Sequence, residues 1–135
     1  MMTVHEVAKK IGITSDAVRH YVRIGLLHPK RNPDNGYRLF SDVDQHRLSF
    51  MVRAKQFGFT LSDMRKIFLD VEAGTSPCPR VRELLEKRMM MNQQKITELL
   101  VMQERMQQAQ QAWTDIPDAM PSDKMLCHLI EKMDA

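Results

Sequence analysis

Hydrophobic residues near the start of the chain recur at the spacing of a short amphipathic helix. Val4, Val7 and Ile11 fall on one face of this helix. Thr3 stands at its N-cap, and Glu6 is placed to complete a capping box, in which each side chain bonds the other residue's backbone. The pattern predicts a helix from Val4 to Ile11.

A second helix follows after a short turn. Gly12 is suited to end the first helix, and Thr14 to cap the second, in which Val18 and Tyr21 share a face before Gly25. Two helices joined by a turn of about three residues are typical of a helix-turn-helix. We therefore predict this motif for the first part of the chain.

The next segment predicts a small β-hairpin. Asn35-Gly36 favours a two-residue turn, because both central positions of a type I′ turn need a positive φ. Pro29 and Pro33 keep the first arm from extending into a longer ladder. A short hairpin directly after a helix-turn-helix is predicted to be a wing.

Two more helices complete a predicted domain over residues 1–75. Ser41 caps the first of them, which ends before Gly58. Thr60 caps the second, in which Asp63 is placed to complete a capping box, and Gly74 closes this helix.

The following segment, residues 76–113, predicts one long helix. Pro79 suits a first helical turn, and neither glycine nor proline interrupts the chain from there to about Ala112. Apolar residues spaced by three and four run along it: Val81, Leu85, Met89, Ile96, Leu99, Met102, Met106, Ala109 and Trp113. A second copy of the same helix is the simplest cover for this stripe, and Asn92 near its centre is suited to fix the register.

The last segment, residues 114–135, is predicted to hold a loop and a short helix that begins at Ser122-Asp123 and carries Met125, Leu126, Leu129 and Ile130. The whole chain is thus expected to be mainly α-helical, with one β-wing.

Charge and composition limit the classes of function that the chain is expected to have. Residues 1–75 hold 12 basic and 8 acidic side chains, whereas residues 76–135 hold 8 and 9, so the first half is suited to meet a polyanion. No apolar run is long enough for a bilayer, and no signal peptide is evident, which predicts a cytoplasmic protein without a membrane partner. The five histidines are scattered and form no catalytic constellation, so an enzyme is not expected.

The second helix and the wing supply the predicted contacts to double-stranded DNA. The N-terminal residues of a recognition helix meet base edges in the major groove. Short basic wings bind the phosphate backbone and make affinity depend on salt. The predicted DNA-contacting residues on the helix are Ser15, Asp16, Arg19 and His20, and those on the wing are Lys30, Arg31, Tyr37 and Arg38.

Together these segments resemble the MerR family of bacterial transcription regulators. The residues that carry the resemblance are Val4-His5-Glu6-Val7-Ala8, Val18-Arg19-His20-Tyr21, Gly25-Leu26-Leu27, Asn35-Gly36-Tyr37-Arg38-Leu39-Phe40 and Phe57-Gly58-Phe59-Thr60-Leu61. The match runs in order from residue 1 to about residue 112. His20 and Phe40 depart from it, since the family often has an aromatic residue and a tyrosine there.

The resemblance implies a homodimer held by an antiparallel coiled coil of the long helices. It also implies that the dimer binds a dyad-symmetric promoter, which an effector causes it to bend and untwist for RNA polymerase. Arg19 and Tyr21 on the recognition helix, with Tyr37 and Arg38 on the wing, match the DNA-contact positions of the family.

The sequence leaves the identity of the effector open. Cys78 and Cys127 resemble the first and last ligand cysteines of metal-sensing members, and in an antiparallel dimer they come from different chains. Trp113 stands where the middle ligand cysteine is expected. Two thiolates leave zinc two ligands short, and His128, Asp123, Met125 or water are the available completions.

A thiophilic or divalent metal ion (Zn, Cd, Pb, Hg or Cu) is therefore one hypothesis for the effector. Thiol oxidation and an organic ligand are the others, and two inert buried cysteines are a further reading. A metal-binding or scaffold protein without promoter activity is a different class of function, and it would not require the placement of Arg19 and Arg38.

Overall fold

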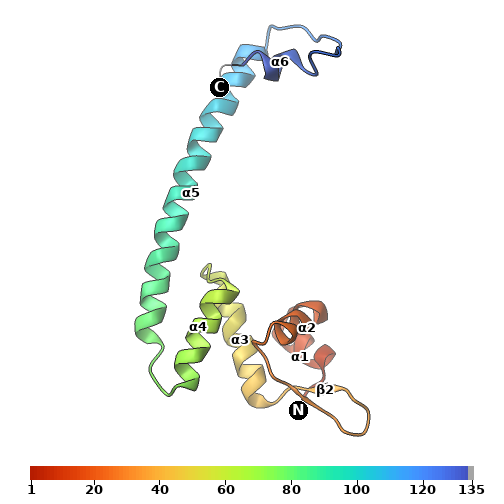
Figure 1. Cartoon of the computed structure of the whole chain (residues 1–135), viewed down its shortest axis with the longest axis vertical. Coiled ribbons are helices and arrows are strands. Elements are labelled where there is room, and N and C mark those ends of the chain that lie inside the picture. Colours follow the sequence, from red (N-terminus) through yellow and green to blue (C-terminus); the bar gives the residue numbers. More distant parts are fainter. Residues whose placement is uncertain (134–135) are drawn as a thin grey trace. The chain divides into compact units, whose positions relative to one another are not determined.

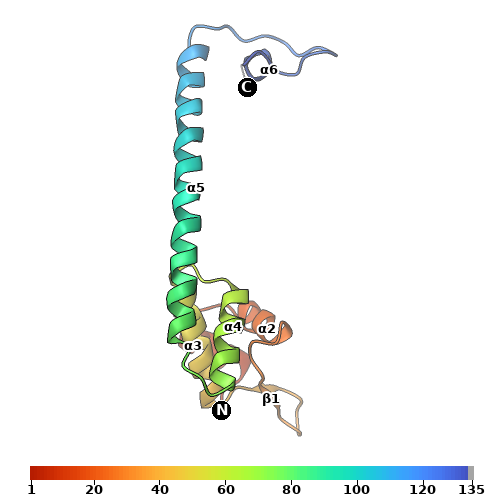
Figure 2. The same cartoon turned by 60° about the vertical axis from the view of Figure 1, so that its left-hand side comes forward.

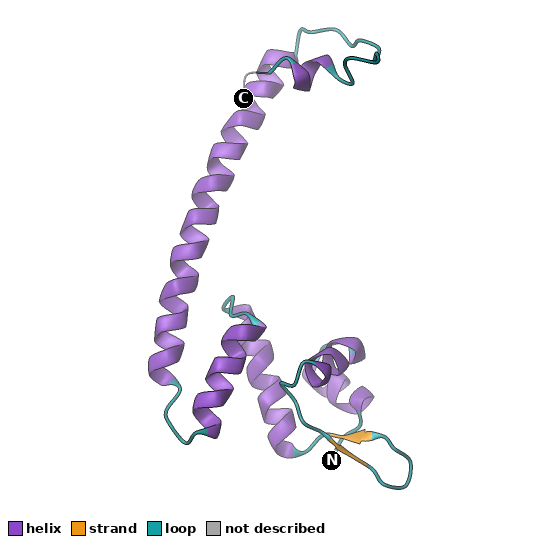
Figure 3. Cartoon of the chain, in the orientation of Figure 1, coloured by secondary structure: helices purple, strands orange, loops and turns teal. Residues whose placement is uncertain are grey.

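A computed structural model of the chain describes residues 1–133 and divides into two compact units, Met1–Arg88 and a second unit that begins at Met89. Figures 1 and 3 show the chain to be mainly helical with one small hairpin. The elements are α1 (Val4–Ile11), α2 (Ser15–Arg23), β1 (Lys30–Arg31), β2 (Arg38–Leu39), α3 (Asp42–Gln56), α4 (Leu61–Glu72), α5 (Cys78–Trp113) and α6 (His128–Glu131).

The predicted N-caps begin the first four helices. The side chains of Thr3, Thr14, Ser41 and Thr60 each accept a hydrogen bond from a backbone N–H in the first turn of the helix that follows. Each such bond satisfies one of the N–H groups that a helix start leaves without an intrahelical partner. The helix boundaries predicted from these residues are confirmed.

The wing is an antiparallel hairpin whose turn is longer than predicted. Lys30 pairs with Leu39 and Arg31 with Arg38, so residues 32–37 connect the two strands. The prediction of a two-residue type I′ turn was wrong, because Gly36 has a positive φ of 73° and Asn35 does not. The side chain of Asn35 instead accepts from the backbone N–H of Tyr37, a local bond that favours a wider loop.

A single hydrophobic core holds the first unit together. Val7 of α1, Val18 of α2, Phe40 beside the wing and Leu48 of α3 are fully buried in it. Leu84 of α5 belongs to the same core, so the first turns of α5 pack with the preceding helices (Figures 1 and 2). The division between the units therefore falls within α5, whereas the sequence pattern placed a domain boundary near residue 75.

The long helix is continuous over Cys78–Trp113, which confirms the predicted helix to within two residues at its start (Figure 3). Most of its apolar stripe is exposed in the single chain, including Met89, Leu99 and Met106. No helix within residues 1–133 combines the length and hydropathy needed to cross a membrane.

The final helix is shorter than predicted. It covers His128–Glu131 and does not begin at Ser122. The backbones of Ser122 and Met125 bond each other in a tight turn, and the Ser122 hydroxyl accepts from the N–H of Lys124. Serine side chains often favour such local turns over helix initiation.

Candidate nucleic-acid interface

A groove of about 470 Å³ lies between α2, which is the predicted recognition helix, the wing and the start of α1. Its wall includes Arg19 from α2, and Arg31, Tyr37 and Arg38 from the wing. Both arginines of the wing and the arginine of α2 thus share one concave surface. Three guanidinium groups on one concave surface form a local positive field that is suited to phosphate groups.

The recognition helix is fixed at both ends. At its start, the Ser15 hydroxyl and Nδ1 of His5 on α1 are 2.9 Å apart. Past its end, the carbonyl of Ile24 accepts a hydrogen bond from the guanidinium of Arg65 on α4. These bonds join α2 to two other helices and define the direction in which its exposed face points.

Arg19 forms a weak local ion pair. Its Nη1 lies 3.1 Å from Oδ1 of Asp16, one helical turn earlier. The Asp16 side chain is almost fully exposed, and pairs on a helix surface at this spacing contribute only about 0.2–0.5 kcal/mol. A phosphate or a guanine edge would therefore displace Asp16 at small cost.

The wing is anchored to the helical core by backbone and side-chain bonds. Met2 and Phe40 exchange backbone hydrogen bonds of 3.1 and 2.7 Å, which place the start of α1 beside β2. The amide of Gln45 donates to the Phe40 carbonyl and accepts from Nζ of Lys10. At the loop, Arg31 donates to the carbonyl of Gly36.

The structure brings together four of the predicted DNA-contacting residues: Arg19, Arg31, Tyr37 and Arg38. Among the other predicted contacts, Ser15, Asp16, His20 and Lys30 lie outside the lining of this groove. Their DNA contacts stay predictions.

Tyr21 is 9% exposed and belongs to the hydrophobic core, with its ring 6.0 Å from that of His20. Its buried ring is part of the fold, and its predicted contact with DNA stays a prediction.

Thr3 and His5 also line the groove, and sequence reasoning missed both. Thr3 was interpreted only as a helix cap. Its place in the groove depends on the pairing of Met2 with Phe40, a contact between distant segments for which the sequence pattern gives no signal.

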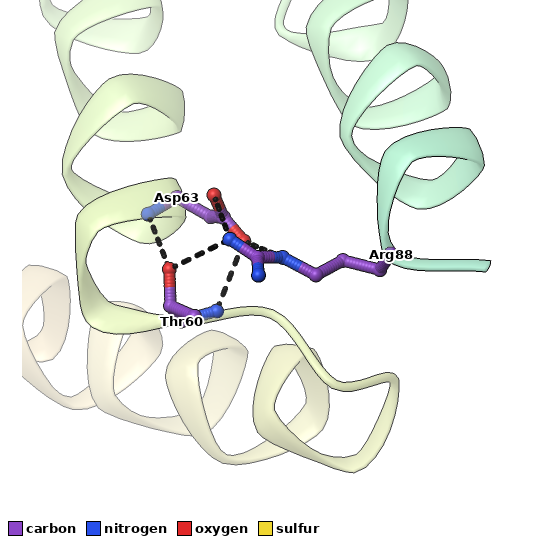
Figure 4. Close-up of polar contacts among 3 residues, drawn as sticks. All are labelled: Thr60, Asp63 and Arg88. Carbon is purple, nitrogen blue, oxygen red and sulfur yellow. Dashed lines mark hydrogen bonds and ion pairs between the residues drawn. The ribbon is translucent and has the colours of Figure 1, made fainter. Parts of the chain in front are cut away.

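Asp63, at the start of α4, binds Arg88 on α5 (Figure 4). Two parallel bonds join the side chains, from Nε to Oδ2 at 2.8 Å and from Nη2 to Oδ1 at 3.0 Å. Asp63 is 2% exposed, and its carboxylate also accepts from the backbone N–H of Thr60. The bonds from Arg88, followed by those from Thr60, hold the pKa of Asp63 below its ordinary value, although burial opposes the shift.

This pair fixes the first turns of α5 to α4. A second ion pair, between Arg80 of α5 and Asp70 of α4, lies in the same unit. The helices before α5 and the beginning of the long helix are thus one packed body.

The predicted metal-binding residues lie in different units of the chain. Both thiols are exposed, with Cys78 in the first unit and Cys127 in the second. Within residues 1–133, no three side chains among histidine, cysteine, aspartate and glutamate are placed to share a metal ion. His128 follows Cys127 directly, and the backbone N–H of Cys127 donates to Glu131. Metal binding by Cys78, Cys127 and His128 therefore stays a prediction.

Two family models match the chain. The model described as "MerR HTH family regulatory protein" matches residues 2–70, and the one described as "MerR, DNA binding" matches residues 45–109. The chain belongs to the MerR family. The resemblance inferred from the sequence motifs is confirmed, and the protein is a DNA-binding transcription regulator in a family of regulators, not of enzymes.

Two relatives of this MerR-family protein show how far the similarity extends. The transcriptional regulator HmrR of Rhizobium leguminosarum bv. viciae is 31% identical over 73% of this chain and 75% of its own length. The mercuric resistance operon regulatory protein of Bacillus cereus is 26% identical over 95% of this chain and 93% of its own length.

Solved structures share the fold of the MerR-family protein. The regulator PbrR691 from Ralstonia metallidurans CH34, in complex with lead(II), has a TM-score of 0.76 and 21% identity, and the match covers 98% of this chain and 100% of that one. HiNmlR, described as a family regulator lacking the sensor domain and bound to promoter DNA, has a TM-score of 0.55 and 26% identity over 86% of this chain and 96% of its own. The winged helix-turn-helix and long helix predicted from the sequence are confirmed at the level of the fold.

Proposed function

We propose that this protein acts as a homodimer on a dyad-symmetric promoter and changes the shape of that DNA in response to an effector. The groove in which Arg19 of the recognition helix faces Arg31 and Arg38 of the wing is the observation that carries this proposal. Because α2 and the wing are both fixed to the same core, the three guanidinium groups form one preorganised surface for the DNA backbone. HiNmlR, a similar regulator, is known in complex with promoter DNA.

The wing and α2 would contact different parts of the DNA. The wing arginines would neutralise phosphates and set the register of the protein on the duplex, which makes affinity fall as salt rises. The exposed face of α2, with Arg19, would read bases in the major groove.

Distorting the duplex for RNA polymerase costs several kcal/mol. The effector must therefore bind one state of the dimer more tightly than the other.

An Arg38→Ala variant tests the wing. The DNA is a duplex that the parent protein selects from a random-sequence library. We expect the affinity of the variant for this duplex to fall about tenfold. The slope of log affinity against log salt concentration should decrease in magnitude by about 1. Fluorescence anisotropy over a range of salt concentrations measures both.

Arg82→Ala is the matched control, since Arg82 is an exposed arginine on α5 outside the groove. Full affinity of Arg38→Ala, or an equal loss in both variants, would count against the wing as a DNA contact.

The names of some relatives refer to metals, which makes a metal ion the first hypothesis for the effector class. By resemblance to metal-sensing members, such a site would join Cys78 of one protomer to Cys127 of its partner, with His128 as a further donor. Elemental analysis of the purified dimer for Zn, Cd, Pb, Hg and Cu tests this.

A Cys78→Ser variant should lose metal if the two protomers share it. Equal uptake by the parent and the variant would exclude the shared thiolate site. Promoter output that changes on thiol oxidation would instead support redox sensing.

A further inference from the structure

A cavity of about 650 Å³ lies in the second unit, between the end of α5 and α6. Its volume falls within the range of roughly 300–1,000 Å³ typical of small-molecule sites. Arg105 and Trp113 line it from α5, and His128, Leu129 and Lys132 line it from α6 and the residue that follows. Residues 105–133 supply the whole lining, so the site belongs to one compact unit.

The polar groups around this cavity favour an anion. Arg105 and Lys132 are cationic, and His128 adds an imidazole, whereas no aspartate or glutamate is part of the lining. Within residues 1–133, three acids adjoin lining residues in the sequence, namely Glu104, Asp115 and Glu131. The carboxylate of Glu131 accepts from the backbone N–H of Cys127 at 2.6 Å, and that of Glu104 accepts from the amide of Gln108. A guanidinium binds a carboxylate through two parallel bonds, and an ammonium adds a compact positive charge.

The remaining walls favour a flat apolar body. Trp113 offers an indole ring, and Ile116 and Leu129 add aliphatic surface. Ala109 and Ala112 also line the cavity, and their small side chains leave room beside the indole. An aromatic ring in this space could stack on the indole and displace water from apolar surface.

The same cavity is poorly suited to a metal. Its lining includes one imidazole, and neither cysteine. Trp113 occupies the position at which the sequence comparison with metal sensors predicted a thiolate, and its indole N–H is a donor without a free lone pair.

We propose that this cavity binds a small aromatic carboxylate, which would be the organic effector that the sequence left open beside a metal ion. The inference rests on the proposed regulation by an effector, and it names an organic anion at the end of the long helix as the competitor of a metal ion. Arg105 and Lys132 hold the carboxylate, and the ring lies against Trp113.

The single tryptophan of the chain reports directly on this cavity. Its indole N–H gives one signal in a nitrogen-15 correlation spectrum of the full-length protein, which can be followed during titration. The probes are 1-naphthoate, its neutral amide 1-naphthamide, and acetate. We expect 1-naphthoate to shift the indole signal to saturation with a Kd of about 1 mM or tighter. The other two probes should bind at least about tenfold more weakly, because each lacks either the charge or the ring.

Variants separate the charge from the shape of the cavity. Arg105→Gln and Lys132→Gln should each weaken 1-naphthoate about tenfold, and Ala112→Leu, which fills the space beside the indole, should abolish saturable binding. Lys124→Gln is the matched control, since it removes the same charge from the same unit outside the cavity. A circular dichroism spectrum and a Tm equal to those of the parent show that each variant keeps its fold.

The proposal is overturned if no probe produces a saturable shift, if 1-naphthamide or acetate binds as tightly as 1-naphthoate, or if Lys124→Gln weakens binding as much as the cavity variants do. Binding of the same samples to the selected duplex is measured in parallel. Protein that binds DNA and no probe would leave the regulator function standing without this ligand. Protein that binds no DNA would contradict the proposed function itself.

Discussion

Asp63 has two roles at the start of α4. Its backbone N–H and its carboxylate both bond Thr60, and the same carboxylate holds Arg88 of α5. The sequence predicted only the first role, because a capping box depends on residues three apart. The partner 25 residues away could not be inferred from spacing, since it depends on how α5 packs against α4.

The pH dependence of stability should report on this carboxylate. Because the pKa of Asp63 is lowered from 3.8 in the folded protein, its contribution is present above that value and is lost as pH falls through the lowered pKa. We expect Asp63→Asn to reduce the free energy of unfolding by about 2 kcal/mol at pH 7. The difference from the parent should shrink below about pH 4.

Urea unfolding followed by circular dichroism at several pH values provides the measurement. Asp42→Asn, which changes an exposed acid in the first turn of α3, is the control and should show a much smaller loss at pH 7. A constant difference between Asp63→Asn and the parent from pH 7 to pH 3 would contradict the assignment.

At the scale of elements, α5 has two environments. Its first turns belong to the N-terminal core through Leu84, whereas the apolar stripe farther along is exposed in the single chain. The periodicity of apolar residues predicted the helix, but it could not show where α5 leaves the N-terminal core. Apolar residues have similar spacing in a helix that packs on a core and in a coiled coil.

Leu84→Ala should therefore destabilise the N-terminal unit. Leu84 is 6% exposed, and truncation of a buried leucine typically costs about 2–5 kcal/mol through lost burial and a residual cavity. Thermal unfolding monitored by circular dichroism should show a clearly lower Tm.

Leu69→Ala on α4 is the matched control, because Leu69 is 58% exposed and should cost far less. If the two variants melted at the same temperature, α5 would not be part of the N-terminal core.

At the scale of the whole molecule, the exposed stripe of α5 is suited to a second copy of the chain. Ile96, Leu99 and Met106 are each at least half exposed and follow one another at coiled-coil spacing. A dimer would also supply two recognition helices, which a dyad-symmetric promoter requires.

Leu99→Asp should convert the dimer into monomer at concentrations where the parent is dimeric, because a charge in the seam would be buried without a partner. Light scattering coupled to size-exclusion chromatography measures the mass.

Gln94→Asp places the same charge on the opposite side of the helix and should remain dimeric. A Leu99→Asp protein with the mass of a dimer would show that the stripe is not the interface.

The structure differs from the predicted pattern at two places where a local turn competes with a regular element. Asn35 bonds the backbone of Tyr37, and the wing loop widens. Ser122 bonds the N–H of Lys124, and the final helix begins only at His128. In both segments, short polar side chains bond nearby backbone groups, and these groups are then not part of a regular strand or helix.

The sequence by itself determined the helices, their caps and the family of this protein, because each depends on residues a few positions apart. Only the tertiary structure decided which side chains share a surface. The pairing of Met2 with Phe40 brings α1 to the wing, and α6 meets the end of α5 to enclose the cavity beside Trp113. Such contacts join segments that the periodic pattern treats separately, and packing of the folded chain is what sets them.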